Sequence, residues 1–260
     1  MLRIVRVLNG LLDRLLALVF LVILLIGLWF TYDTAYVFYH ASADRVAAHR
    51  PGSTAAAAKP LSKDCVAWLH VDDTTIDYPI MQGKTNTEYL NKDPYGDYSL
   101  SGSIFLDTRN KPDFSDSYSL TYGHHMAGGL MFGALDDFLK EDFFRQHRTG
   151  TLTLMKPPDS EKRDGGEKTD RGIPFEIFAV LETDANIIEL FEPLGSERAL
   201  AYAATHAKYY SDPKTTHILA LTTCVDAVHT TRTVVLCALE GEMECCKKEF
   251  RDSLRCCSVC

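Results

Sequence analysis

The chain has 260 residues, of which 46% are hydrophobic and 24% are charged. These fractions are typical of a folded protein, and the length allows one good-sized domain with appendages, so a wholly disordered chain is excluded. The formal net charge of -8 argues against binding to a phosphate backbone, because nucleic-acid-binding proteins are usually basic. We therefore expect no nucleic acid among the partners.

An apolar run from Leu15 to Phe30 dominates the N-terminal region, and Arg3, Arg6 and Arg14 precede it. With Leu11 and Leu12 included, the segment approaches the roughly 20 residues that a helix needs to cross a bilayer. A cleaved signal peptide or a buried helix is the alternative, but large aromatic residues stand where a cleavage site would need small ones. Because the arginines come first, we expect residues 1–32 to be a cytoplasmic tip and a single membrane span, with the rest of the chain outside the cell.

Residues 33–65 are predicted to form a juxtamembrane helix and a linker. Apolar residues continue at helical spacing from Thr34 to Arg50, and the turn formers Pro51-Gly52-Ser53 are expected to end that helix. An alanine run then leads to Lys59-Pro60, as in a linker.

From Val66 the pattern changes to short alternating segments separated by turn formers, which is typical of β-strands. Two helical patches, Met131–Phe144 and Glu197–Tyr210, interrupt the strands, and Pro157–Gly172 is predicted to be an exposed loop. Short strands at regular spacing with few peripheral helices predict a closed or nearly closed β-barrel over residues 66–240. After the first strands, between Trp68 and Ile80, the predicted strands are Ser103–Leu106, Ser119–Tyr122, Thr151–Met155, Phe175–Leu181, His217–Thr222 and Thr233–Leu239.

Three residues at the ends of predicted strands are candidates for chemistry. Cys224 follows one strand, and Arg232, eight residues later, begins the next, so the two are expected to share a pocket. His124 ends another strand about a hundred residues earlier. A cysteine and a histidine far apart in sequence, each at a strand end, suit a nucleophile and its base. Taken alone, the residues also allow a buried structural cysteine, a solvated histidine and a surface arginine.

Several blocks of this sequence resemble the sortases. The run Leu221-Thr222-Thr223-Cys224, followed by Arg232, resembles their signature, and Tyr122-Gly123-His124-His125-Met126 with Met131-Phe132-Gly133 resembles the histidine region of class B. The resemblance covers roughly Trp68 to Leu239. Further blocks that carry it are Trp68-Leu69-His70, Ile76-Asp77-Tyr78-Pro79-Ile80, Gln82-Gly83, Asn86, Tyr89-Leu90, Gly102-Ser103-Ile104-Phe105-Leu106-Asp107, Phe143-Phe144 and His147.

This resemblance implies a mainly β fold with peripheral helices, a sortase-like eight-stranded β-barrel preceded by an N-terminal transmembrane helix. It implies a membrane-anchored cysteine transpeptidase of a Gram-positive cell surface, with no cofactor and no metal. Such an enzyme cleaves a C-terminal sorting signal after its threonine, and class B precedent favours a signal of the Asn-Pro-x-Thr type. The acyl group passes through a thioacyl-enzyme to an amine on a peptidoglycan precursor or a pilin.

The same resemblance assigns roles to the three candidates. Cys224 would be the nucleophile and His124 its acid/base partner. Arg232 would hold the oxyanion, because a guanidinium does not readily lose its proton. His125 is the competitor for the acid/base role. The family pattern puts the catalytic histidine directly after the glycine, which selects His124.

The residues expected to bind substrate are Asn86, Leu90, Thr222 and Thr223, again by resemblance. Ordinary core packing is the alternative for Leu90. Asp226 is a candidate for orienting His124 or a substrate amide, with a solvated loop carboxylate as the alternative.

The predicted tail, residues 241–260, departs from the family pattern because it holds five of the eight cysteines. Their spacing allows disulfides or a thiolate metal site, although adjacent cysteines match the usual metal spacing poorly. Two other functions therefore stay open: a non-catalytic sortase-like binding or scaffold protein, and a thiol redox or metal-binding protein that uses this tail. Cys65 and Cys237 are expected to be structural. The tail cysteines are Cys245, Cys246, Cys256, Cys257 and Cys260.

Overall fold

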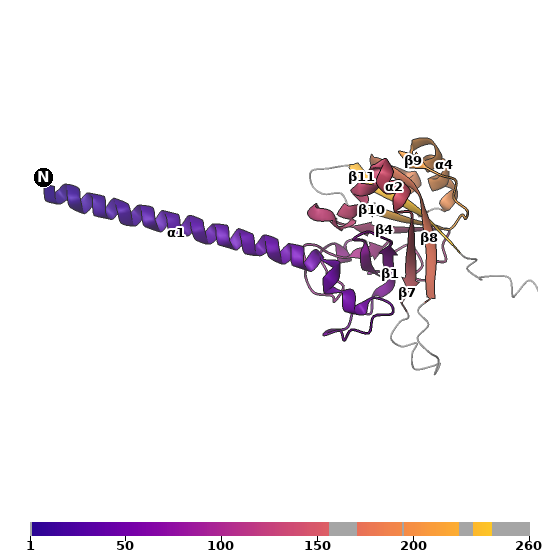
Figure 1. Ribbon diagram of the computed structural model, residues 1–260, viewed down its shortest axis with the longest axis horizontal. Coiled ribbons are helices and arrows are strands. Elements are labelled where there is room, and N and C mark those ends of the chain that lie inside the picture. The colour runs from indigo at the N-terminus through magenta and orange to yellow at the C-terminus, as the bar shows by residue number, and fades with distance from the viewer. Residues whose placement is uncertain (1, 156–170, 194, 224–230, 241–260) are drawn as a thin grey trace, which may run out of the picture. The chain divides into compact units, whose positions relative to one another are not determined.

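The computed structural model describes residues 2–155, 171–193, 195–223 and 231–240, and the chain divides into two compact units, Met1–His40 and Ala41–Cys260 (Figure 1). Helix α1 (Leu2–Ala41) makes up the first unit and ends on the first residue of the second. The second unit is a β-barrel with short helices.

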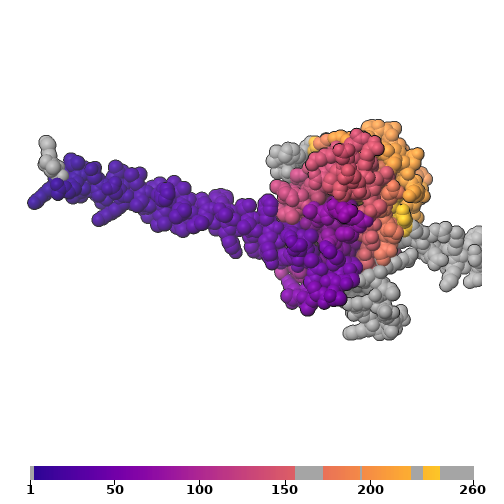
Figure 2. Space-filling model, in the orientation of Figure 1, coloured from indigo at the N-terminus to yellow at the C-terminus, as the bar shows by residue number. Residues whose placement is uncertain are grey.

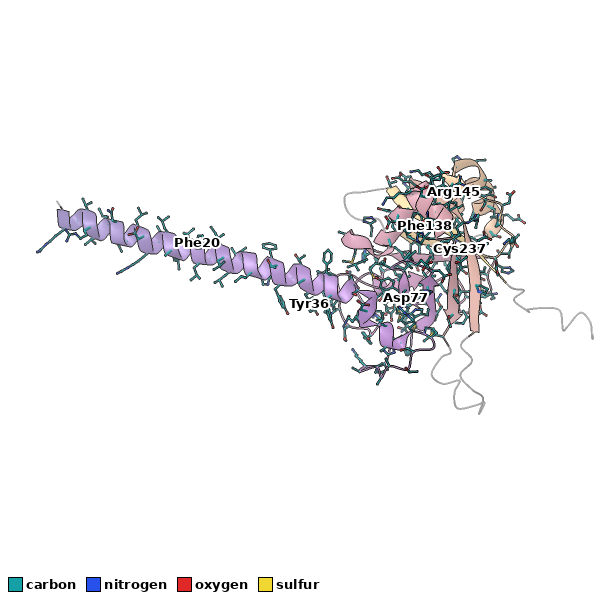
Figure 3. All side chains as sticks on the ribbon, viewed as in Figure 1. Phe20, Tyr36, Asp77, Phe138, Arg145 and Cys237 are labelled. Carbon is teal, nitrogen blue, oxygen red and sulfur yellow. The ribbon has the colours of Figure 1, made fainter. Side chains whose placement is uncertain are left out.

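Helix α1 is long and apolar enough to cross a membrane: Arg3–Ala41 has a mean hydropathy of 2.7 over its most apolar window, and none of that window is buried (Figure 2). Side chains such as Phe20 and Tyr36 project freely from it (Figure 3). Aromatic residues gather toward its C-terminal end, as in segments that meet a membrane–water interface. The helix is therefore a candidate membrane span, as the sequence predicted.

The helix ends at Ala41, so the prediction of a helix through Arg50 was wrong beyond that point. Ser42 adopts an extended conformation, and its Oγ accepts a hydrogen bond from the Asp44 N–H. Tyr78 Oη donates to the Ala41 carbonyl oxygen over 3.1 Å, inside the barrel unit. Tertiary packing thus stops the α-helix where the local pattern would have continued it. Two 3-10 helices follow, η1 (Ala43–Arg45) and η2 (Ala47–His49).

Eight of the described strands close into a barrel. Their order is β11-β10-β4-β3-β2-β1-β7-β8, and β8 pairs with β11 to complete the ring, which confirms the predicted eight-stranded barrel. The pairs β2–β3 and β4–β10 are parallel, and the other pairs in the ring are antiparallel. A short strand, β9, extends the sheet beside β8. The strands are β1 (Cys65–Val71), β2 (Asp77–Met81), β3 (Ile104–Leu106), β4 (Tyr118–Gly123), β7 (Thr149–Leu154), β8 (Arg171–Asp184), β9 (Tyr209–Tyr210), β10 (Ile218–Thr223) and β11 (Thr231–Leu239).

Both predicted helical patches contain helix, with different ends. The patch Met131–Phe144 becomes a 3-10 helix and a short α-helix, and the patch Glu197–Tyr210 is helical only as far as His206. The end of the second patch, Tyr209-Tyr210, pairs with β8 instead, as suits two aromatic residues. The remaining elements are η3 (Glu88–Leu90), β5 (His125–Met126), η4 (Ala127–Gly129), β6 (Leu130–Met131), η5 (Phe132–Leu139), α2 (Glu141–Gln146), α3 (Ile188–Phe191) and α4 (Ser196–His206).

Strand β10 is buried on both faces, which explains its unbroken apolar sequence. Leu219 and Leu221 point into the barrel core, whereas Ala220 packs in a second cluster with Ala199 and Ala203 of α4. The backbone of β10 is therefore fixed from both sides up to Thr223, where the described part of the strand ends.

The two cysteines in the described part of the barrel lie in apolar surroundings. Cys237 is fully buried in the core cluster that also holds Phe138 (Figure 3), and burial raises the pKa of its thiol. Burial likewise raises the pKa of Cys65 to about 12. Neither thiol is activated, as expected of structural cysteines.

Gly133 gives the first testable prediction. A Cβ at this position would lie 2.0 Å from the Met126 carbonyl oxygen, so η5 packs under the β5–β6 hairpin only without a side chain there. We expect Gly133→Ala to lower the free energy of unfolding by ~3 kcal/mol, because backbone rather than a flexible side chain must move. Urea unfolding of the full-length chain in detergent micelles measures it.

Gly172→Ala is the matched control, because its Cβ would meet side-chain atoms and no backbone: the Thr151 methyl group at 3.1 Å and Thr153 Oγ1 at 3.9 Å. A Gly133→Ala variant as stable as Gly172→Ala would contradict the steric argument.

Candidate active site

The candidate residues meet at one edge of the barrel because of the strand register. Parallel pairing of β4 and β10 sets Gly123 opposite Thr223, so the C-terminal ends of the two strands lie side by side. His124 follows Gly123 directly. The antiparallel partner β11 starts at the same edge and brings Arg232 there. Cys224, the residue after Thr223 in the sequence, lies outside the described residues.

His124 is held through both its ring and its backbone. Its Nε2 lies 2.8 Å from the Leu90 carbonyl oxygen, and Phe132 N–H donates to the His124 carbonyl over 3.0 Å. A carbonyl only accepts, so Nε2 carries a proton in this arrangement. Gly123 is required just before it, since a Cβ there would come within 2.7 Å of the Phe132 ring. The structure thus brings the predicted residues Leu90 and His124 together.

His125 faces a different partner. Its Nε2 lies 2.6 Å from Asp136 Oδ2, and the other oxygen of that carboxylate accepts from Thr233 Oγ1 over 2.7 Å. The Thr233 N–H in turn donates to Thr223 Oγ1 over 3.1 Å. Asp136 therefore ties the β5–β6 hairpin to β11 and, through Thr233, to the end of β10.

Arg232 is flanked by two aromatic rings. Its guanidinium carbon lies 4.7 Å from the centre of the Phe191 ring and 5.8 Å from that of Tyr122. Its Nε is buried and has no hydrogen-bond partner among the described residues. Cation–π attraction to the rings therefore orients this side of the guanidinium.

A fully buried carboxylate, Asp107, lies behind these residues. It accepts two hydrogen bonds from the Arg109 guanidinium, at 2.8 and 2.9 Å, one from Asn86 Nδ2 at 2.9 Å and one from Tyr122 Oη at 3.2 Å. Burial acts to raise the pKa of Asp107, but the hydrogen bonds and charge of Arg109, together with the hydrogen bond from Asn86, hold that pKa below its ordinary value. The carboxylate therefore stays charged and organises its neighbours.

The family model for the sortase domain matches residues 69–240 of the chain. The chain belongs to the sortase family. Sortase B of Listeria monocytogenes is 34% identical over 171 residues, which cover 63% of this sortase and 64% of the relative. Sortase B of Staphylococcus aureus is 40% identical over 88 residues, or 34% of this chain and 36% of the relative.

Solved structures agree. A Streptococcus pyogenes class B sortase involved in pilus biogenesis is 39% identical, with a TM-score of 0.58 over 69% of this sortase and 94% of that chain. A Staphylococcus aureus sortase B–substrate complex is 27% identical, with a TM-score of 0.57 over 70% of this sortase and 82% of that chain. The prediction of a class B sortase is confirmed. The sequence matches themselves span less than two thirds of each curated relative.

The substrate-binding residues predicted for this sortase stay predictions. The amide of Asn86 is engaged at both ends, by Asp107 and by the Thr108 N–H, which donates to Asn86 Oδ1 over 2.8 Å. Thr222 and Thr223 are buried, and the Thr223 hydroxyl accepts the Thr233 N–H. Asp226 and the cysteines of residues 241–260 lie outside the described residues.

Sequence reasoning missed four residues that shape the site. Asp107 and Arg109 carried a signal, because a carboxylate and an arginine two residues apart follow directly after an apolar strand. Asp136 and Phe191 carried none, since each acts on a strand that lies far away in the sequence: Asp136 on Thr233, and Phe191 on Arg232.

The Asp107 network of this sortase gives the second prediction. The folded-state pKa lies below the unfolded value of about 3.9, so the carboxylate contributes stability above pH ~4 and loses it as the pH falls through the folded-state pKa. At pH 7 we expect Asp107→Asn to lower the free energy of unfolding by roughly 2–3 kcal/mol through lost charge-assisted hydrogen bonds. Urea unfolding from about pH 7 down to about pH 3, which passes through the unfolded-state pKa, measures the difference in unfolding free energy between the variant and wild type.

Asp97→Asn is the control, since Asp97 pairs with Lys59 on the exposed surface. We expect this variant to leave the urea midpoint of unfolding unchanged. A gap between Asp107→Asn and wild type that stays constant on acidification would show that the charge of Asp107 is not responsible.

Proposed function

We propose that this sortase is a cysteine transpeptidase with Cys224 as nucleophile, His124 as acid/base and Arg232 as the oxyanion donor. One observation carries the proposal: His124, Arg232 and Thr223, the residue before Cys224 in sequence, meet at one edge of the barrel. Family membership supports the same assignment, because the matched range, residues 69–240, contains all three candidates.

The chemistry follows from these groups. The Cys224 thiolate attacks the carbonyl of the signal threonine, and Arg232 donates to the oxyanion that forms. The carbon–nitrogen bond breaks, the leaving amine takes a proton from His124, and a thioacyl-enzyme remains. An incoming amine then gives a proton to His124, forms the new amide bond and displaces the Cys224 thiolate. Because Nε2 of His124 donates to the Leu90 carbonyl, Nδ1 is the ring atom that exchanges these protons.

The substrate would be a secreted protein with a C-terminal sorting signal of the Asn-Pro-x-Thr type. The groove residues would be Leu90, Thr222 and Thr223, with Asn86 held in place by Asp107. The acceptor would be an amine on a peptidoglycan precursor or a pilin, and the similarity to a Streptococcus pyogenes sortase involved in pilus biogenesis is compatible with the second. No cofactor takes part in this scheme.

The apolar helix α1 supports a membrane location. We propose that residues 1–32 form the cytoplasmic tip and membrane anchor, residues 33–65 the connection, residues 66–240 the extracellular catalytic barrel and residues 241–260 the tail. The arginines before the apolar run favour this orientation, with the N-terminus in the cytoplasm.

Intact-mass spectrometry tests the proposal. The full-length chain in detergent micelles is incubated with a library of Asn-Pro-x-Thr peptides, beside the Cys224→Ala and His124→Ala variants. We expect a peptide adduct that hydroxylamine releases and that Cys224→Ala lacks. Absence of both adduct and cleavage, in folded protein with reduced Cys224, would favour the binding or scaffold alternative.

The two neighbouring histidines give a separate prediction. We expect His124→Ala to lower kcat/KM for peptide cleavage by about 10²–10⁴-fold, the usual contribution of a general acid–base. His125→Ala should cost less than about 5-fold, because its ring is committed to Asp136 at the rim of the site. Initial rates with a fluorogenic peptide compare them, and the reverse ranking would move the acid/base role to His125.

A further inference from the structure

We propose that Arg109 is a positioning residue that sets the orientation of Arg232 by holding Phe191. The inference rests on the proposed oxyanion role of Arg232 and adds the residues that aim it. The two arginines come from distant parts of the sequence, and Phe191 contacts both of them: its carbonyl accepts from Arg109, and its ring lies beside Arg232.

The first step is the anchor of Arg109. The Arg109 guanidinium binds both oxygens of the fully buried Asp107 through Nε and Nη2. The backbone N–H of Arg109 also donates to Asp107 Oδ1, over 2.9 Å. A bidentate pair of this kind fixes the plane of the guanidinium as well as its position. The Arg109 side chain is thus held in one orientation just after the end of β3.

The second step is the contact of Arg109 with the C-terminal end of α3. The free edge of the Arg109 guanidinium pairs with the Glu192 carboxylate through Nη1, and Nη2 donates to the Phe191 carbonyl over 3.2 Å. These groups lie where α3 ends, so Arg109 satisfies a carbonyl of the last helical residue and a side chain beside it. Without the Arg109 guanidinium, the C-terminal end of this four-residue helix would lose both of these contacts.

The third step is the contact with Arg232. The Phe191 ring lies 4.7 Å from its guanidinium carbon, and the Tyr122 ring lies at 5.8 Å. Tyr122 Oη donates to the same Asp107. Both aromatic neighbours of Arg232 are therefore fixed by one carboxylate, Phe191 through Arg109 and Tyr122 directly.

The consequence concerns geometry at the transition state. An oxyanion donor is effective only when it is held about 3 Å from the developing charge, and small displacements are costly. Arg232 Nε has no hydrogen-bond partner among the described residues, so the rings carry much of the orientation. Loosening Phe191 would leave substrate contacts elsewhere in place and affect the chemical step.

Kinetics of the full-length chain in micelles test this inference. We expect Arg109→Gln and Phe191→Leu each to lower kcat for peptide cleavage by about 10-fold, with KM within about 2-fold, as loss of a desolvated cation–π contact implies. The double variant should be no more than about 2-fold worse than either single one, because both changes remove the same restraint. Phe191→Tyr, which keeps the ring, should restore kcat.

Arg148→Gln is the matched control. Arg148 is also clamped, with Nη2 to Glu176, Nε to the Ile177 carbonyl and a ring contact with Phe144, but it has no contact with Arg232. It should lower the melting temperature and leave kcat unchanged. Arg109→Lys replaces Arg109→Gln if the latter does not fold, since lysine keeps the charge against Asp107 and loses the planar guanidinium.

The inference would be overturned if Arg109→Gln left kcat unchanged or altered KM alone. It would also be overturned if the kcat losses of the two single variants multiplied in the double variant. A second readout does not need activity: the Nε–H NMR signal of Arg232, assigned by its loss in Arg232→Lys. It should move in Arg109→Gln and Phe191→Leu, because the ring shifts it, and stay in place in Arg148→Gln. A signal that is unmoved in both would reject the inference even if wild type cleaves no peptide, which would count against the proposed function alone.

Discussion

The parallel pairing of β4 with β10 is the constraint on which the site depends. It sets Gly123 against Thr223 and so brings together residues about a hundred positions apart in the sequence. A slip of one residue would reverse which side chains face the core, and β10 cannot slip because both of its faces are buried. The barrel therefore fixes the spacing between His124 and the end of β10 before any side chain at the site contributes.

A second level of order comes from charge. Asp107 is buried and charged, which is tolerable only because Arg109, Asn86 and Tyr122 supply donors to it. These partners come from the segment before η3, from β4 and from the residues after β3. One carboxylate thus connects three segments around the site, and Arg109 connects it further to Phe191. Buried polar networks of this kind add specificity when all members are satisfied.

The sequence predicts the barrel, the apolar helix and the positions of His124 and Arg232 at strand ends, because strand patterns and a family signature are local or recurrent features. It does not predict where α1 ends, because Tyr78 and the core decide that at Ala41. It also misses Phe191, which sits on a four-residue helix with no periodic pattern. Long-range contacts between irregular segments leave no signal in a single sequence, whereas Asp107 and Arg109, close together after a strand, leave a faint one.

The hairpin that follows His124 shows how strain and packing are balanced near the site. Met131 has a positive φ of 53°, which is costly for a residue with a side chain, and its N–H donates to Tyr78 Oη over 3.2 Å. Tyr78 is buried, and burial raises the pKa of its hydroxyl, so the group stays neutral and can both accept and donate. Since Tyr78 Oη also donates to the Ala41 carbonyl, one hydroxyl links Ala41 to this hairpin. The conformation of the hairpin next to His124 therefore depends on the core as well as on the site.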